Sequence, residues 1–278
     1  MVAAERAGTF LREQRPASLL VESKSTATDA VTEMDRASEA LLVAELAGGG
    51  DGILGEEGGE RPGESGVRWV VDPLDGTVNY LYRSPVWAVS VAAEVAGESV
   101  VGVVRAPDLG ITWFAAKGQG AWRVDGDGPA RRIRVAAESD LARALIGTGF
   151  GYAAAARVGQ AERLVRVIGR VRDIRRAGAA AVDMCWVADG TLDGYFEEGT
   201  HHWDRAAAAV IITEAGGIVC GPERGAPTDA MTIAGNATIA WSLTEILRPA
   251  ASTAEDPADA GGASLSPGDA EAPGTAAH

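Results

Sequence analysis

The stretch from Trp69 to Tyr80 constrains this chain most, because its character changes abruptly after three residues. Residues 69–71 are apolar and β-prone, which predicts a short buried strand. Asp72 and Asp75 follow, so two carboxylates lie at the end of that strand. Such a pair can converge on one hard cation, and Mg²⁺ prefers oxygen ligands. An isolated Asp-Pro-x-Asp is more often a simple turn, so other segments have to decide between a turn and a metal site.

The residues after the two aspartates suit a phosphate group. Gly76 allows the backbone to approach a ligand closely. A helix that opens at the following residues would present free N–H groups to an anion. The stretch therefore predicts a metal and a phosphate bound side by side.

Composition excludes several classes of protein. The chain has 278 residues, of which 46% are hydrophobic and 23% charged, as is ordinary for a globular protein. No window offers about 18 uninterrupted apolar residues, so we expect no membrane span. The N-terminus lacks the apolar segment of a signal peptide, which makes a cytoplasmic location the default. The net charge of −14 argues against nucleic-acid binding as the main role.

Cysteine and histidine give little support to other chemistry. Cys185 and Cys220 both lie in apolar surroundings, which predicts small buried residues more than a disulfide. With three histidines in the chain, a zinc site of His and Cys ligands is not expected.

Strand-like and helix-like runs are mixed along the chain, which predicts an α+β fold. Residues 28–46 predict a helix, and four runs between residues 86 and 124 predict an antiparallel meander. Residues 55–66 predict an exposed loop. After the meander, strands and helices alternate up to residue 247, with a helix expected over residues 177–188. We expect one domain over residues 1–248, made of two intimately packed halves that divide near residue 140. Residues 249–278 are acidic and rich in Ala, Pro and Gly, which predicts a disordered tail.

Four further segments place acids at the ends of predicted elements. They are Asp29 to Asp35, Glu56-Glu57, Glu197-Glu198 and Trp203-Asp204. Each has an ordinary explanation when taken alone, as a helix cap, a solvated loop or an exposed strand end.

Together these segments resemble the inositol monophosphatase family in the order of the motifs and in the residues of each motif. Residues 72–80 are similar to the first signature of that family, and residues 203–208, continuing to 214–217, are similar to the second. Gly55-Glu56-Glu57 and residues 29–35 resemble its two further acidic motifs. The resemblance spans about residues 24–247 and implies a layered α/β/α/β/α sandwich of the α+β class. It also implies a phosphoric monoester hydrolase that needs Mg²⁺, is inhibited by Li⁺ and forms a homodimer.

The resemblance implies a role for each matching position. Two to three Mg²⁺ ions would be held by Glu56, Asp72, the carbonyl of Leu74, Asp75 and Asp204. The catalytic residues would be Asp35, Thr77 and Glu56, with Thr77 held by Asp35 and activating the attacking water. The backbone amides of Gly76 and Thr77 would cradle the phosphate. Substrate contacts would come from Gly178, Ala179, Ala180, Glu197 and Asp204, with Glu57 and Lys24 nearby.

The implied reaction agrees with elementary chemistry. Hydrolysis of a phosphate monoester needs charge neutralisation on the phosphoryl oxygens and an activated water, and a metal pair supplies both. A threonine hydroxyl is a poor base, so a carboxylate behind it is reasonable. Ala179 stands where relatives commonly have Ser or Thr, so only a backbone contact is expected there.

The substrate stays open at this stage. Inositol monophosphate is favoured because Glu197 can reach a ring hydroxyl. Histidinol phosphate, fructose 1,6-bisphosphate and adenosine 3′,5′-bisphosphate are the alternatives, and Arg175 and Arg176 could favour a second phosphate. No clear aromatic or basic pocket for a nucleotide base is evident in the sequence. A partner-binding regulatory protein with incidental catalysis is the alternative from another class.

Overall fold

The computed structural model describes residues 1–15, 21–23 and 30–248. The proposed roles of Lys24 and Asp29 and the predicted disorder of residues 249–278 therefore lie outside the described residues. Contacts group Met1–Arg248 into one compact unit. Within the described ranges, no helix is both long and apolar enough to cross a membrane.

The larger sheet carries the opening motif. Its strand order is β10-β9-β8-β7-β6-β5-β3-β4. The strands are β3 (Gly52–Gly55), β4 (Gly59–Arg61), β5 (Val67–Asp75), β6 (Ala88–Val95), β7 (Glu98–Ala106), β8 (Ile111–Ala116), β9 (Ala121–Asp125) and β10 (Arg131–Arg132). Strands β6 to β9 form the antiparallel meander that the sequence predicts. Strand β5 pairs antiparallel with β6, and β3 runs parallel to β5.

The second sheet has five strands in the order β12-β11-β13-β15-β14. They are β11 (Leu145–Thr148), β12 (Asp173–Arg175), β13 (Gly194–Glu197), β14 (Ile218–Cys220) and β15 (Thr232–Gly235). Strand β11 is parallel to both β12 and β13, and the other pairings are antiparallel. A separate hairpin-like pair joins β1 (Val21–Ser23) to β2 (Ala30–Thr32).

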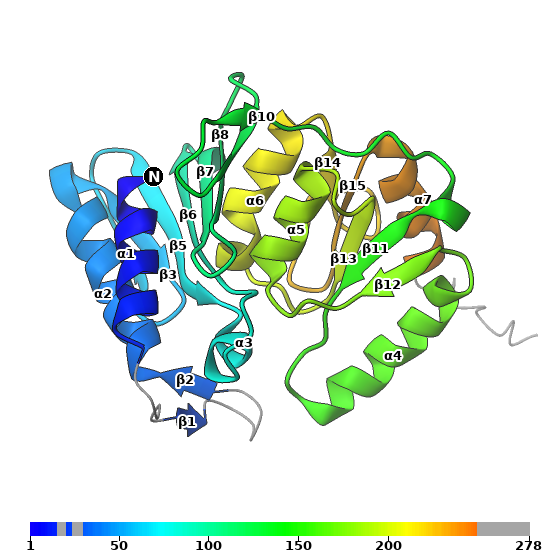
Figure 1. Cartoon of the computed structure of the whole chain (residues 1–278), viewed down its shortest axis with the longest axis horizontal. Coiled ribbons are helices and arrows are strands. Elements are labelled where there is room, and N and C mark those ends of the chain that lie inside the picture. Colours follow the sequence, from blue (N-terminus) through cyan, green and yellow to red (C-terminus); the bar gives the residue numbers. More distant parts are fainter. Residues whose placement is uncertain (16–20, 24–29, 249–278) are drawn as a thin grey trace, which may run out of the picture. The chain divides into compact units, whose positions relative to one another are not determined.

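Helices separate and cover the two large sheets (Figure 1). They are α1 (Val2–Glu13), α2 (Glu33–Leu46), α3 (Thr77–Leu81), α4 (Ala154–Ile168), α5 (Ala180–Ala188), α6 (His202–Glu214) and α7 (Ala237–Leu247), with the 3₁₀ turns η1 (Gly48–Gly50) and η2 (Leu141–Arg143). Helices α1 and α2 pack on the outer face of the larger sheet, and α5 and α6 lie between the two sheets. Helix α7 packs on the second sheet with α4 against it. This layering confirms the predicted fold class.

The alanine-rich helix α6 packs very closely on the larger sheet. Its buried residues Ala206, Ala207 and Ala208 have small side chains, so its backbone can approach β7. A Cβ added at Gly102 of β7 would lie 2.2 Å from the carbonyl oxygen of Ala207. Small residues on both elements therefore set the distance between the helix and the sheet, and thereby the position of the α6 N-terminus at the site.

Several element boundaries differ from the prediction. The helix expected from Thr28 begins at Glu33, because the chain first forms β2. The helix expected from Ala177 begins at Ala180, because Gly178 has φ +90°, which a helix does not accept. The expected loop between Gly55 and Gly66 contains the exposed strand β4.

Candidate active site

The predicted site residues meet where parallel strands end in both sheets. In the larger sheet Gly55 of β3 pairs with Val71 of β5, so Glu56 and Asp72 leave adjacent strand ends. In the second sheet Thr148 of β11 pairs with Phe196 of β13, which brings Glu197 to an equivalent edge. Ligands of open α/β sheets commonly bind beyond the carboxyl ends of strands. Both sheets therefore contribute to one site.

A cavity of about 480 Å³ lies at these strand ends. Its lining includes ten of the residues predicted for the site, which are Glu56, Asp72, Leu74, Asp75, Gly76, Thr77, Gly178, Ala180, Glu197 and Asp204. Ala179 is buried and does not line the cavity, so its side chain is not in position for a substrate contact. Asp35 and Glu57 lie beside the cavity wall rather than in it.

Asp75 connects the end of β5 to the N-terminus of α5. Its Oδ1 accepts a hydrogen bond from the amide of Ala180 at 3.0 Å, and its Oδ2 accepts one from the amide of Ala181 at 2.9 Å. Free N–H groups at a helix start favour an anion, so this contact stabilises the carboxylate. The interaction spans more than a hundred residues of sequence and joins the two halves of the site.

Gly76 makes this close approach possible. Its φ is +85°, and an added Cβ would lie 3.0 Å from the Cβ of Ala179 and 3.1 Å from the Val86 carbonyl oxygen. Three residues later, the Asn79 amide donates to the carbonyls of Val86 at 2.6 Å and Ala177 at 2.8 Å. The segment after β5 is therefore tied to the segment before α5.

Thr77 lies at the start of α3 with two acceptors in reach. Its Oγ1 is 3.3 Å from Oδ2 of Asp35 and 3.1 Å from the carbonyl oxygen of Leu74. Asp35 is fully buried in the first turn of α2. A single hydroxyl proton can be directed to either acceptor, which leaves the oxygen lone pairs available to a water.

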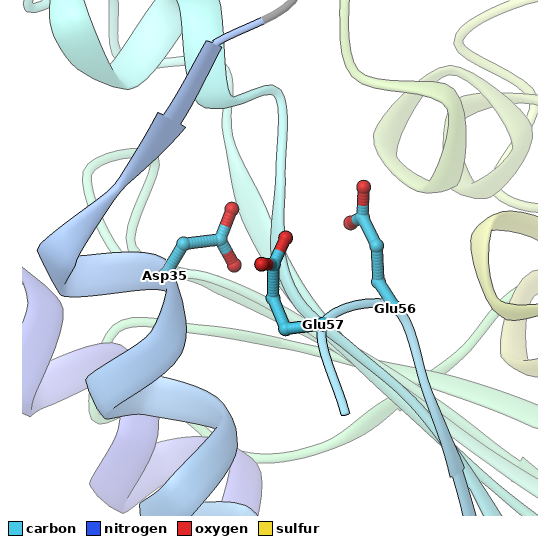
Figure 2. Close-up of side chains that lie close together, drawn as sticks. All are labelled: Asp35, Glu56 and Glu57. Carbon is cyan, nitrogen blue, oxygen red and sulfur yellow. The ribbon is translucent and has the colours of Figure 1, made fainter. Parts of the chain in front are cut away.

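Asp35, Glu56 and Glu57 form an acidic group next to Thr77. One carboxylate oxygen from each lies within 4.8 Å of the others, which is a separation that a metal ion could bridge. Figure 2 shows Asp35 projecting from the start of α2 toward the Glu56–Glu57 loop. The group thus combines residues from two separate sequence motifs.

Glu39 supports this loop and was not predicted. Its carboxylate accepts hydrogen bonds from the amides of Glu57 at 2.8 Å and Gly58 at 2.6 Å. A Cβ added at Gly55 or Gly58 would lie 2.6 Å or 2.5 Å from the nearest Glu39 oxygen, so both glycines make room for it. The Gly-Glu-Glu-Gly loop is therefore folded around a buried glutamate of α2.

The carboxylates at the cavity repel one another. Burial raises the pKa of Asp75 to about 8 and that of Asp204 to about 8, with repulsion between acids adding to the shift. Burial, with the charges of Glu56 and Asp75, also raises the pKa of Asp72 well above its usual value. A bound cation would relieve this repulsion, and carboxylate and carbonyl oxygens are the donors that Mg²⁺ prefers. The donor set therefore suits Mg²⁺, which would be held by Glu56, Asp72, Leu74, Asp75 and Asp204.

The cavity lining was only partly predicted. Phe150, Tyr152, Trp203 and Arg176 also line the cavity, so aromatic and basic side chains reach it although no such pocket was evident in the sequence. Phe150 and Tyr152 alternate with Gly149 and Gly151 between β11 and α4. This alternation of aromatic residues and glycines is the sequence pattern that could have indicated the aromatic part of the lining. The indole N–H of Trp203 is buried and has no hydrogen-bond acceptor among the described residues.

Comparison with known proteins agrees with this site. Residues 1–255 match the inositol monophosphatase family. The chain is 47% identical over 214 residues to the inositol-1-monophosphatase of Mycobacterium leprae, covering 74% of this chain and 73% of the relative. It is 38% identical over 224 residues to a Nus factor SuhB of Pasteurella multocida, covering 78% of this chain and 82% of that protein.

Solved structures show the same fold. The suhB protein of Bartonella henselae superposes with a TM-score of 0.80 at 36% identity, covering 88% of this chain and 95% of that chain. Mycobacterium tuberculosis SuhB superposes with a TM-score of 0.75 at 40% identity, covering 88% of this chain and 92% of that chain. The fold and the acidic cavity define a phosphatase. The chain belongs to the inositol monophosphatase family.

Proposed function

We propose that this enzyme hydrolyses inositol 1-phosphate to inositol and phosphate with Mg²⁺ as cofactor. The observation that carries the proposal is the cavity itself, where carboxylates from the larger sheet face Glu197 from the second sheet. A phosphate held near the acids would place its organic part toward Glu197. The inositol-1-monophosphatase relatives support the same substrate.

Each residue has a distinct task in this reaction. When bound, Mg²⁺ neutralises the phosphoryl oxygens and lowers the pKa of water. The backbone amides of Gly76 and Thr77 would donate hydrogen bonds to the phosphate oxygens at the start of α3. Thr77 orients the attacking water, and Asp35, 3.3 Å from its hydroxyl, takes up the proton that the hydroxyl passes on. Glu197 accepts a hydrogen bond from a polyol hydroxyl.

A substrate panel tests the proposal directly. Phosphate release would be measured with inositol 1-phosphate, histidinol phosphate, fructose 1,6-bisphosphate and adenosine 3′,5′-bisphosphate, with Mg²⁺ and with EDTA. We expect inositol 1-phosphate to give the highest kcat/KM, activity to require Mg²⁺, and Li⁺ to inhibit. Equal activity in EDTA would refute the cofactor, and a clear preference for another phosphate would refute the substrate.

A bisphosphate is the second candidate, because of Arg176. Arg175 turns to Asp173, with Nη1 and Oδ2 2.5 Å apart, whereas Arg176 lines the cavity. Among the described residues, no carboxylate lies at ion-pair distance from Arg176, but its positive charge opposes the rise in the pKa of Asp183 and Glu197 that burial causes. The second phosphate of a bisphosphate substrate could form an ion pair with the Arg176 guanidinium group. In that case Arg176→Gln would raise KM for fructose 1,6-bisphosphate about 10-fold or more. The control variant Arg175→Gln would keep a KM close to that of the unchanged protein.

The predicted homodimer and cytoplasmic location stay predictions. Helix α4 offers a surface for a second copy, since Val158, Val165 and Ile168 are 63%, 73% and 53% exposed on one side of it. We expect Val165→Glu to convert a dimer to a monomer, as measured by light scattering. An unchanged molar mass would exclude α4 as the interface.

A partner-binding role remains the proposal of a different class. Relatives from Pasteurella multocida and Salmonella typhimurium are named Nus factor SuhB. The full set of acids around one cavity favours the enzyme, because a binding protein has no need of buried carboxylates such as Asp72 and Asp75 that are repelled by neighbouring acids. An Asp75→Asn variant that loses phosphatase activity but keeps the biological role would favour the partner-binding protein.

A further inference from the structure

Glu197 is held in place by a buried tyrosine. Tyr195 and Glu197 are two residues apart on β13, so their side chains lie on the same face of the strand. Tyr195 is fully buried, and its hydroxyl donates a hydrogen bond to Oε2 of Glu197 at 2.6 Å. A buried tyrosine hydroxyl needs a partner, and here that partner is a carboxylate that lines the cavity. The hydrogen bond therefore couples the core of the protein to the cavity wall.

Gly149 restricts the position of the Glu197 carboxylate from a second side. It follows the end of β11, the parallel neighbour of β13. A Cβ added at Gly149 would lie 2.1 Å from Cδ, Oε1 and Oε2 of Glu197. Gly149 is not among the residues with positive φ, so the need for glycine here is space and not backbone conformation. The carboxylate of Glu197 thus rests directly on the Gly149 backbone.

These two contacts define the position of a side chain that would otherwise be mobile. Glutamate has three rotatable side-chain bonds, and ordering such a side chain when a ligand binds reduces affinity. The hydrogen bond from Tyr195 uses one acceptor position of the carboxylate and leaves others for a ligand. The acceptor is therefore ordered before any substrate arrives.

We propose that Tyr195 is a positioning residue which, with Gly149, holds Glu197 so that the enzyme selects phosphate monoesters whose organic part carries a hydroxyl group. The inference rests on the proposed function, because it assumes that Glu197 meets the polyol. It adds the reason for selectivity. A fixed carboxylate accepts a hydrogen bond from a substrate hydroxyl at one defined place, and a phosphate ester without a hydroxyl gains no affinity from that carboxylate.

The test compares two substrates that differ in this group. Inositol 1-phosphate carries hydroxyls, and p-nitrophenyl phosphate carries none. Tyr195→Phe removes only the hydroxyl, and Tyr82→Phe at an 84% exposed position is the matched control. We expect the ratio of kcat/KM for inositol 1-phosphate to kcat/KM for p-nitrophenyl phosphate to fall about 10-fold in Tyr195→Phe, mainly through KM. Tyr82→Phe should keep the ratio of the unchanged protein.

Two further variants separate positioning from a general loss of structure. Gly149→Ala should lower the same ratio by another route, because the added methyl group displaces the Glu197 carboxylate. In a Glu197→Ala background, Tyr195→Phe should change the ratio less than twofold, since the group that it positions is gone. Thermal unfolding of each variant checks that the fold is kept.

The outcomes distinguish this inference from the proposed function. If the unchanged protein prefers inositol 1-phosphate and folded Tyr195→Phe keeps that preference, the inference is wrong and the proposed function stands. Equal losses on both substrates would assign Tyr195 a purely structural role and would also overturn the inference. If the unchanged protein does not hydrolyse inositol 1-phosphate, the proposed substrate is wrong.

Discussion

Neutralising one acid of the cavity should stabilise the protein when no metal is present. Asp204 is the best choice, because it accepts one backbone hydrogen bond, from the His201 amide at 2.6 Å. The Oδ1 atom of an asparagine can accept the same bond. Asp75 is less suitable since both of its oxygens accept backbone hydrogen bonds. We therefore predict that Asp204→Asn raises the free energy of unfolding in EDTA.

The magnitude follows from the pKa of Asp204. Burial and the charges of Asp75 and Glu56 raise this pKa from 3.8 to about 8. One pKa unit corresponds to about 1.4 kcal/mol, so the full shift would cost about 4 kcal/mol at pH 7. Asp204 is only half-buried and shares the repulsion with its neighbours, so we expect about 1–2 kcal/mol.

The raised pKa of Asp204 also defines how the free energy of unfolding changes with pH. The folded state of the metal-free protein keeps a proton on this acid that the unfolded state releases, so stability is highest below about pH 4 and falls as the pH rises toward 8. The advantage of Asp204→Asn should therefore grow between pH 5 and pH 8. Saturating Mg²⁺ should reverse the order, because it binds the ionised carboxylates of the unchanged protein more tightly.

Denaturant unfolding measures the free energy of unfolding of each protein under four conditions, at pH 5 and pH 8 and in EDTA and Mg²⁺. Asp127→Asn at an exposed position is the control and should change stability by less than about 0.5 kcal/mol. A variant that is less stable than the unchanged protein in EDTA at pH 8 would refute the electrostatic reasoning. Equal stabilisation of both proteins by Mg²⁺ would refute Asp204 as a ligand.

Three other substitutions test separate parts of the site. Thr77→Ala should lower kcat about 10²- to 10⁴-fold in phosphate release while Thr77→Ser keeps most of it, because the hydroxyl orients the water; equal activity of the two would exclude that role. Glu39→Gln should weaken Mg²⁺ binding about 10- to 100-fold by calorimetry, since it loosens the loop that carries Glu56; an unchanged Kd would contradict this. Asn79→Ala leaves two carbonyls without their donor and should lower the free energy of unfolding by about 1–3 kcal/mol in urea; a loss below 0.5 kcal/mol, the size of a surface change, would show that water replaces the amide.

Much of the candidate site could be predicted because it is local. Asp72, Asp75, Gly76 and Thr77 lie within six residues, so a strand end and a helix start place them together whatever surrounds them. The meander from β6 to β9 was equally predictable, since each turn joins neighbouring strands. Short β3 was missed, because four residues rich in glycine carry little strand signal.

Contacts between distant segments could not be predicted in this way. Arg175 and Arg176 are equivalent in the sequence, and the packing of β12 alone decides that Arg176 reaches the cavity while Arg175 pairs with Asp173. Glu39 supports Glu57 across eighteen residues, and Asp75 meets Ala180 across more than a hundred. No periodicity encodes such pairings, because they depend on how helices and sheets stack.

The sequence by itself determined which groups meet after the strand, since Asp72, Asp75, Gly76 and Thr77 are close enough along the chain for local geometry to place them together. The tertiary structure alone decided what surrounds these groups. Gly149 lies directly against the Glu197 carboxylate because β11 and β13 run parallel and end at one edge. The reason is physical: backbone geometry acts over a few residues, whereas the shape of a cavity depends on side chains that only the packing of two sheets brings together.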